Sequence, residues 1–140
     1  MFVRINEAES RSLLSTLNVG RLGCIVDGGP YVVPINYYFE DGYVYSHSLQ
    51  GLKITALREN SRACLQVDDV ASGTEWRSVL AFGKYEEITK PSERSQILSK
   101  LLQYFPLLTP VESAIVEDAE PLSVIVFRIR IDRISGVAEE

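Results

Sequence analysis

Apolar and polar residues alternate with a period of two along much of the chain, which predicts a protein built mainly from β-strands. The alternation is clearest in a strand expected over residues 31–40. One set of alternate positions is apolar and aromatic and should face the core: Tyr31, Val33, Ile35, Tyr37 and Phe39. The other set is more polar and should face away from it: Val32, Pro34, Asn36, Tyr38 and Glu40.

Turn sequences on both sides of this strand predict where the neighbouring strands begin and end. Asp27-Gly28-Gly29-Pro30 predicts a turn before it, and Asp41-Gly42 predicts a tight hairpin after it, because glycine readily adopts positive φ angles. The other expected strands are Leu22–Val26, Tyr43–His47, Ala63–Val67, Trp76–Ile88 with a bend or bulge at Gly83, and Leu122–Asp132. The segment from Asp68 to Glu75 is expected to form a polar loop.

Helical signals are confined to shorter segments. The expected helices are residues 7–17 with an Asn6/Glu9 cap, residues 51–59, residues 92–104 after Pro91, and a short one from Thr109 to about 117. Segments between the strands are too short for repeated βαβ crossovers, which disfavours a parallel sheet. Six antiparallel strands with flanking helices therefore predict a closed or partly closed β-barrel, as one domain over residues 1–140.

Composition narrows the class of protein. The 140 residues are 46% hydrophobic and 24% charged, as in ordinary globular proteins, and the net charge of −5 without a Lys/Arg cluster argues against a nucleic-acid partner. No apolar run approaches the roughly 20 residues that span a bilayer, and early acidic residues argue against a signal peptide. Cys24 and Cys64 lie in apolar runs, so buried free thiols of a cytoplasmic protein are expected, with a disulfide as the alternative.

Candidate chemistry begins where the helix at 51–59 should start. A helix N-terminus offers unpaired N–H groups to an anion such as a phosphate ester, Ser48 can add a hydroxyl, Gly51 allows close approach and Lys53 supplies positive charge. Serine and glycine before a helix are also ordinary capping residues. These three residues predict a phosphate site only in combination with other features.

The strand at 31–40 supplies such a feature. Pro34 cannot donate a ladder hydrogen bond, so the strand is unpaired there or lies at a sheet edge, and backbone groups near Ile35 and Asn36 could bind a ligand. Alternation places the Tyr37 side chain in the core rather than against a ligand. Further along, Trp76, Arg77 and Ser78 could line a pocket or clamp a phosphate, although Trp76 also suits the rim of a barrel.

The single histidine, His47, allows two interpretations, a hydrogen-bonded structural residue or a catalytic group. No second histidine or cysteine cluster accompanies it, so a zinc site is not expected. Asp68-Asp69 and Glu86-Glu87 are adjacent pairs, which point to opposite faces of a strand and are expected to be solvated rather than paired for acid–base catalysis.

Taken in order, these segments resemble a known family. Val33-Pro34-Ile35-Asn36-Tyr37, a hairpin, Tyr45-Ser46-His47-Ser48, and then Gly51-Leu52-Lys53 with Leu57 and Asn60 resemble the pyridoxamine 5'-phosphate oxidase-like flavoproteins. Trp76-Arg77-Ser78-Val79 to Gly83 is similar to the branch of that family with nitroimidazole-resistance proteins. The resemblance covers residues 7–88 well and the last third loosely.

The resemblance implies a split β-barrel that forms a homodimer with FMN at the subunit interface. It implies that Pro34, Ile35, Asn36 and Tyr37 border the flavin ring through main-chain groups, and that Ser48 and Lys53 contact its phosphate, with Arg77 and Ser78 as possible additions. It also implies that His47 lies near the flavin. The substrate-binding arginine and histidine of the B6-oxidising enzymes are not identifiable, because Arg128 and Arg130 alternate with apolar residues as on a solvated strand face.

Three functions remain open from the sequence. The first is an NAD(P)H-dependent oxidoreductase in which FMN reduces a small acceptor such as a nitroaromatic or a quinone, with His47 as proton donor or positioning residue. The second is a non-enzymatic FMN-binding or storage protein. The third is a haem-binding split barrel with His47 as the axial ligand.

Overall fold

The computed structural model of the chain describes residues 1–105 and 124–140. Within these two stretches the chain forms eight strands and three helices. In chain order they are β1 (Phe2–Ile5), α1 (Glu7–Thr16), β2 (Val19–Val26), β3 (Gly29–Asn36), β4 (Tyr38–Glu40), β5 (Tyr43–Leu49), α2 (Leu52–Glu59), β6 (Arg62–Ser72), β7 (Glu75–Glu87), α3 (Pro91–Tyr104) and β8 (Val124–Glu139).

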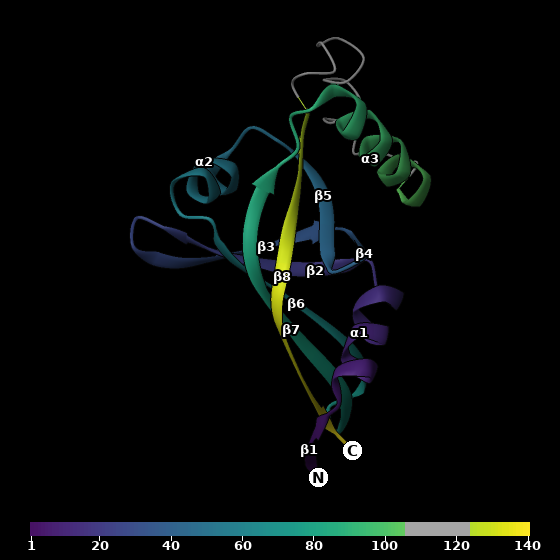
Figure 1. Cartoon of the computed structure of the whole chain (residues 1–140). Helices are drawn as coiled ribbons and strands as arrows, with labels where there is room; N and C mark the ends of the chain where they lie inside the picture. Colours follow the sequence, from purple (N-terminus) through teal and green to yellow (C-terminus); the bar gives the residue numbers. More distant parts are fainter. Residues whose placement is uncertain (106–123) are drawn as a thin grey trace.

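All of these strands join one antiparallel sheet in the order β3-β2-β6-β7-β8-β5-β4, with β1 paired to β8. The sheet curls into a partly closed barrel, and α2 and α3 lie at the end away from both chain termini (Figure 1). The mainly β antiparallel fold expected from the alternation is therefore confirmed. None of the helices in the described residues is long and apolar enough to cross a membrane.

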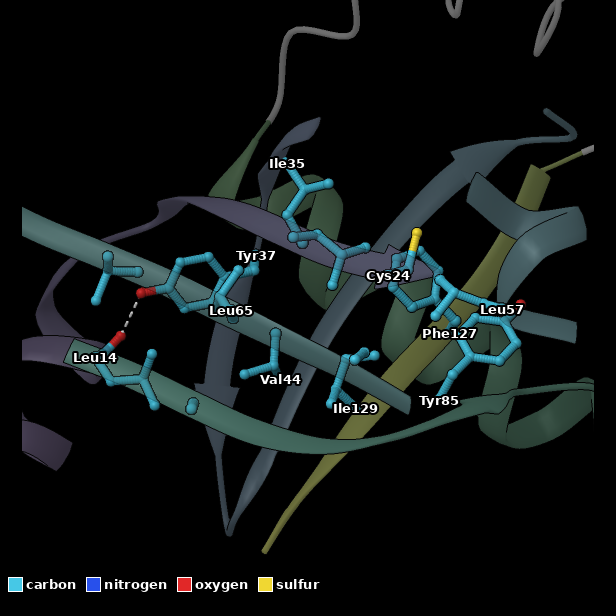
Figure 2. Close-up of a cluster of buried hydrophobic side chains, with 14 of the residues drawn as sticks. Leu14, Cys24, Ile35, Tyr37, Val44, Leu57, Leu65, Tyr85, Phe127 and Ile129 are labelled. Carbon is cyan, nitrogen blue, oxygen red and sulfur yellow. Dashed lines mark hydrogen bonds between the residues drawn. The ribbon is translucent and has the colours of Figure 1, made fainter. Parts of the chain in front are cut away.

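Two apolar clusters stabilise the sheet from its two sides. The main cluster fills the inside of the curl, where Tyr37 and Phe127 are fully buried among aliphatic side chains (Figure 2). The second cluster lies between the opposite side of the sheet and α3, and contains Tyr38, Ile88, Ile97, Leu101 and Val126. The predicted alternation of residues 31–40 is confirmed, because Tyr37 and Tyr38 enter different clusters.

Local signals for turns and caps are confirmed. Asn6 Oδ1 accepts a hydrogen bond from the Glu9 N–H at 2.8 Å at the start of α1. Both predicted hairpins have positive φ at the two central residues, 50° and 79° at Asp27 and Gly28, and 53° and 83° at Asp41 and Gly42. The register of β7 against β8 shifts after Phe82, and a side chain at Gly83 would clash with the Arg130 carbonyl. The irregularity expected at Gly83 is present, but its extra residue is Asp132 on the partner strand β8.

The predicted count of six strands is wrong, for two reasons. β1 has four residues, too few for alternation to reveal it, and the strand expected over 31–40 breaks into β3 and β4. The break occurs at Tyr37, whose N–H donates to the Asn18 carbonyl at 3.0 Å and whose hydroxyl donates to the buried Leu14 carbonyl at 2.7 Å. After Tyr37 the chain leaves β2 and pairs with β5 instead.

Two predicted boundaries are also wrong. The expected loop from Asp68 to Glu75 is strand for most of its length, because β6 runs to Ser72 and β7 starts at Glu75. The last strand was expected to end at Asp132, but β8 passes the bulge there and continues to Glu139. The helix expected from Thr109 to about 117 and the start of the last strand, Leu122, lie outside the described residues.

Candidate functional site

The start of α2 has the features of an anion site. Gly51 is the N-cap residue and provides no side-chain cap, and the first helical hydrogen bond runs from the Thr55 N–H to the Gly51 carbonyl at 3.1 Å. The N–H groups of residues 52–54 consequently have no partner inside the helix. They carry the positive end of the helix dipole, which favours a negatively charged ligand.

Lys53 is the second residue of α2 and brings a positive charge to its first turn. Burial raises the pKa of the Cys24 thiol and the nearby Cys64 adds to the rise, whereas the Lys53 ammonium acts in the opposite direction. Lys53 therefore acts electrostatically on Cys24, which pairs with Tyr31 of β3. Cys24 and Cys64 are free thiols, as expected from the sequence. Cys24 is buried as predicted, whereas Cys64 is only partly buried.

Ser48 differs from its predicted role in one respect. Its side chain is buried, and its hydroxyl donates to the Leu49 carbonyl at 2.8 Å. The hydroxyl proton is thus already used, and Ser48 would have to rotate its O–H to donate to a ligand.

The open edge of β3 is built as Pro34 predicted. Among the described strands, β3 pairs with β2 alone and ends the sheet. The Tyr37 N–H donates to the carbonyl of Asn18, the residue just before β2. Backbone groups of every second residue in an antiparallel strand point to the same neighbour, so those of Ile35 also face β2. The Pro34 carbonyl and the Asn36 N–H then point to the open edge, and both residues are exposed, whereas the Asn36 carbonyl accepts a hydrogen bond from Ser46 Oγ.

The side chains of Ile35 and Tyr37 do not face this edge. Both are buried in the main cluster, and the Tyr37 N–H is already used by Asn18. The main-chain contacts expected from four residues therefore narrow to those of Pro34 and Asn36.

His47 and Ser48 lie on opposite faces of β5. Val44, Ser46 and Ser48 turn toward the main cluster, whereas His47 is partly exposed and pairs with Val126 of the second cluster. The two side chains expected at one site therefore do not share a face. His47 instead lies, like Asn36, on the side of the sheet away from the main cluster.

Trp76, Arg77 and Ser78 begin β7 at the other end of the sheet, beside the chain termini (Figure 1). Trp76 packs edge-on against Phe2 with ring centres 5.8 Å apart, and Ser78 Oγ accepts from Gln66 Nε2 at 3.0 Å. Trp76 and Arg77 line an open groove with Asp69 and Glu139. Within one chain, these residues and the start of α2 are not brought together.

Glu86 and Glu87 point to opposite faces of the strand as predicted, but both are partly buried in ion pairs rather than solvated. Glu86 bonds to Arg128 Nε at 2.8 Å on one face of β7, and Glu87 bonds to Arg58 on the other. The Arg128 guanidinium also lies over the Tyr43 ring, 4.2 Å from its centre, so it is held between two partners rather than solvated.

Comparison with known proteins places this arrangement in a family. The sequence pattern of the pyridoxamine 5'-phosphate oxidase family matches residues 6–138. The chain belongs to this family. Its fold is therefore the split β-barrel that the sequence resemblance implied.

Three relatives illustrate the range of the family. A FAD-binding protein of Mesorhizobium loti is 32% identical, with 100% of this chain and 99% of that chain covered and a TM-score of 0.83. A candidate 5-nitroimidazole antibiotic resistance protein of Bacteroides thetaiotaomicron is 22% identical, covered at 100% and 92%, with a TM-score of 0.75, and shows the common fold. An uncharacterized protein of Rhizobium meliloti is 36% identical over 89 residues, which span 63% of this chain and 59% of that protein.

Sequence reasoning did not single out Ser46, which lies beside the candidate site. Its side chain is buried, and its hydroxyl donates to the Asn36 carbonyl at 2.6 Å, which ties β5 to the end of β3. This bond fixes the peptide at the point where the open edge ends. A polar residue at an inward position of an alternating strand was the available signal, because a buried hydroxyl requires a partner.

Proposed function

We propose that this chain is a flavoprotein that binds FMN and reduces a small acceptor. The observation that carries the proposal is the start of α2, where Gly51 provides no side-chain cap and Lys53 lies in the first turn. Lys53 also acts electrostatically on Cys24 of β2, the strand that pairs with the open-edged β3. The N–H groups and Lys53 would hold the phosphate, and the exposed backbone of Pro34 and Asn36 would border the ring. The full-length likeness to a FAD-binding protein supports a flavin.

FMN rather than FAD is proposed because a terminal phosphate ester carries close to two negative charges, which match a helix dipole and one lysine. The test is the visible spectrum of the purified protein, followed by chromatography of the ligand released on denaturation. Released FMN is the expected result. Released FAD would keep the flavin proposal and overturn the choice of FMN, and a colourless protein that binds neither flavin would overturn both.

We further propose a homodimer that covers the outer face of the sheet. The strand register puts five exposed apolar residues on this face, away from the main cluster: Val19, Ile25, Val32, Val70 and Leu80. Val32 and Val70 are 63% and 60% exposed, so a second copy on this face would remove their apolar surface from water. A second copy on this face would also cover Pro34 and Asn36, and so would close the proposed flavin edge.

The proposed reaction takes electrons from NADH or NADPH and delivers them to a nitroaromatic or a quinone. Bound FMN supplies the electron-transfer chemistry, and the chain binds, orients and shields it. His47 is on the same side of the sheet as Asn36, from which it could donate a proton or position the acceptor. The family's named substrate is not proposed, because Arg128 is already engaged by Glu86 and Tyr43.

Turnover is tested by anaerobic addition of each nicotinamide, which should bleach the flavin absorbance, followed by reoxidation with a nitroaromatic. His47→Ala should retain the flavin and lose turnover. If neither nicotinamide bleaches the flavin in either form, the reductase proposal fails and flavin binding without turnover is favoured.

A further inference from the structure

A hydrogen-bonded network flanks α2 on the side that faces β7. Arg58 near the end of α2 donates Nε and Nη2 to the two carboxylate oxygens of Glu87, at 2.8 and 3.1 Å. The Tyr85 hydroxyl donates to the same carboxylate at 2.6 Å. Burial above all raises the pKa of Tyr85, so this hydroxyl stays protonated and remains a donor at neutral pH.

The same guanidinium reaches back to the turn before the helix. Arg58 Nη1 donates to Gln50 Oε1 at 3.0 Å, and Gln50 Nε2 donates to Thr55 Oγ1 at 3.2 Å. Gln50 directly precedes the N-cap Gly51, so its side chain folds along α2 and is held between two residues of that helix. The turn is thereby tied both to α2 and, through Glu87, to β7.

This tie replaces a capping side chain. A serine or aspartate cap would secure the helix start by occupying one of its first N–H groups, and would compete with an anion for it. Here Gly51 leaves those N–H groups open, and the position of the turn is fixed through side chains on the flank of the helix. The forked geometry matters, because arginine can hold a carboxylate and an amide at once, whereas lysine presents a single point charge.

We propose that Arg58 is a positioning residue for the phosphate group of the ligand, acting through Gln50 and held in place by Glu87. It does not touch the phosphate. It preorganises the turn at Gln50 and Gly51 so that the open N–H groups of α2 converge on one anion. The inference rests on the proposed flavin site at the start of α2 and assigns the residues that keep this site in shape.

The test compares the affinity for FMN with the affinity for riboflavin, which lacks the phosphate, in flavin-fluorescence titrations. Arg58→Lys and Gln50→Ala should each weaken FMN binding about 10-fold and riboflavin binding less than about 2-fold. The double variant should lose no more than either single one, because both changes release the same turn. Arg11→Ala, which removes an exposed ion pair with Glu7 on α1, is the matched control and should change neither affinity.

Gln50 is exposed, so its variant keeps the test valid if Arg58→Lys is poorly folded. The positioning role would be overturned if both variants lost FMN and riboflavin affinity equally, or if neither affinity changed in either variant. Both outcomes would leave the proposed site intact. If the unchanged protein itself showed no preference for FMN over riboflavin, the phosphate site would fail, and the positioning role with it.

Discussion

The residues predicted for the site lie at two ends of the sheet. One group is at the start of α2, and the other, Trp76 and Arg77, is beside the chain termini. The two groups differ in how firmly hydrogen bonds within one chain hold them in place. At the α2 end, Ser46 fixes the Asn36 peptide and Arg58 fixes the turn at Gln50. At the end with the termini, Arg77 has an ion pair with Asp69 at 3.7 Å, in which the two side chains are 50% and 58% exposed.

This difference indicates which half needs a partner. The α2 end is held in shape by the chain's own hydrogen bonds, whereas Trp76 and Arg77 line a groove that remains open. The outer face of the sheet, with its five exposed apolar residues, extends between the two ends, from Val32 of β3 to Leu80 of β7. If a second copy covers this face, the half at the termini of one chain can complete the half at α2 of the other.

The largest expected effect comes from removing that second copy. Leu80→Lys should convert the proposed dimer to a monomer and weaken FMN binding by more than about 100-fold, because an unpaired charge buried in an interface costs several kcal/mol. Sedimentation velocity and flavin titration measure the two effects. Leu102→Lys on α3 is a matched control, since both leucines are 37% exposed. A Leu80→Lys dimer with full affinity would contradict the shared site.

A smaller effect is expected from the half that one chain builds. Lys53→Ala should weaken FMN binding roughly 10- to 100-fold with little change for riboflavin, because the lost contact is a charge-assisted one to the phosphate. Lys84→Ala, at an exposed position on β7, should change neither affinity. Equal losses for both ligands would show that Lys53 stabilises the fold near Cys24 rather than a phosphate.

Features of the fold that depend on neighbouring residues could be predicted from the sequence. The two Asp-Gly turns, the Asn6 cap and the edge position of Pro34 each follow from local backbone chemistry. The break at Tyr37 could not be predicted, because it depends on bonds to Asn18 and Leu14 that form only after folding.

The candidate site divides in the same way. The open start of α2 is a local property of Gly51, whereas the bonds of Ser46 to Asn36 and of Arg58 to Glu87 join strands and helices whose approach the alternation does not specify. The segment at Asp68 and Asp69 was expected to be a loop because its polar residues obscure the alternation. They lie on a strand whose side chains form ion pairs with Arg21 and Arg77.

Arg77→Ala should weaken FMN binding by about 3- to 10-fold, less than Lys53→Ala, because the Arg77 side chain is half exposed and only loosely held. Mixing the two variants tests whether the site is shared. In a heterodimer of Lys53→Ala with Arg77→Ala chains, a shared arrangement leaves one of the two sites with both native residues. Half of the sites should then bind FMN with the affinity of the unchanged protein. If every site in the mixture stayed weak, both residues would act within one chain.

The smallest expected effect is on thermal stability, whose pH dependence should differ between a variant at the α2 end and a variant at the end with the termini. Arg58, chiefly through its hydrogen bonds, lowers the pKa of Glu87 below the ordinary value of 4.5. A carboxylate with a lowered pKa stabilises the fold at pH values above 4.5, and this contribution is lost as the pH falls through the lowered pKa. Glu87→Gln should therefore lower the Tm by roughly 3 °C at pH 7, and the deficit should shrink as the pH falls below 4.5.

Asp69→Asn removes the exposed ion pair at the other end and should change the Tm by less than about 1 °C. A Glu87→Gln deficit that stayed constant down to pH 3 would mean that the carboxylate charge does not hold the α2 end in shape.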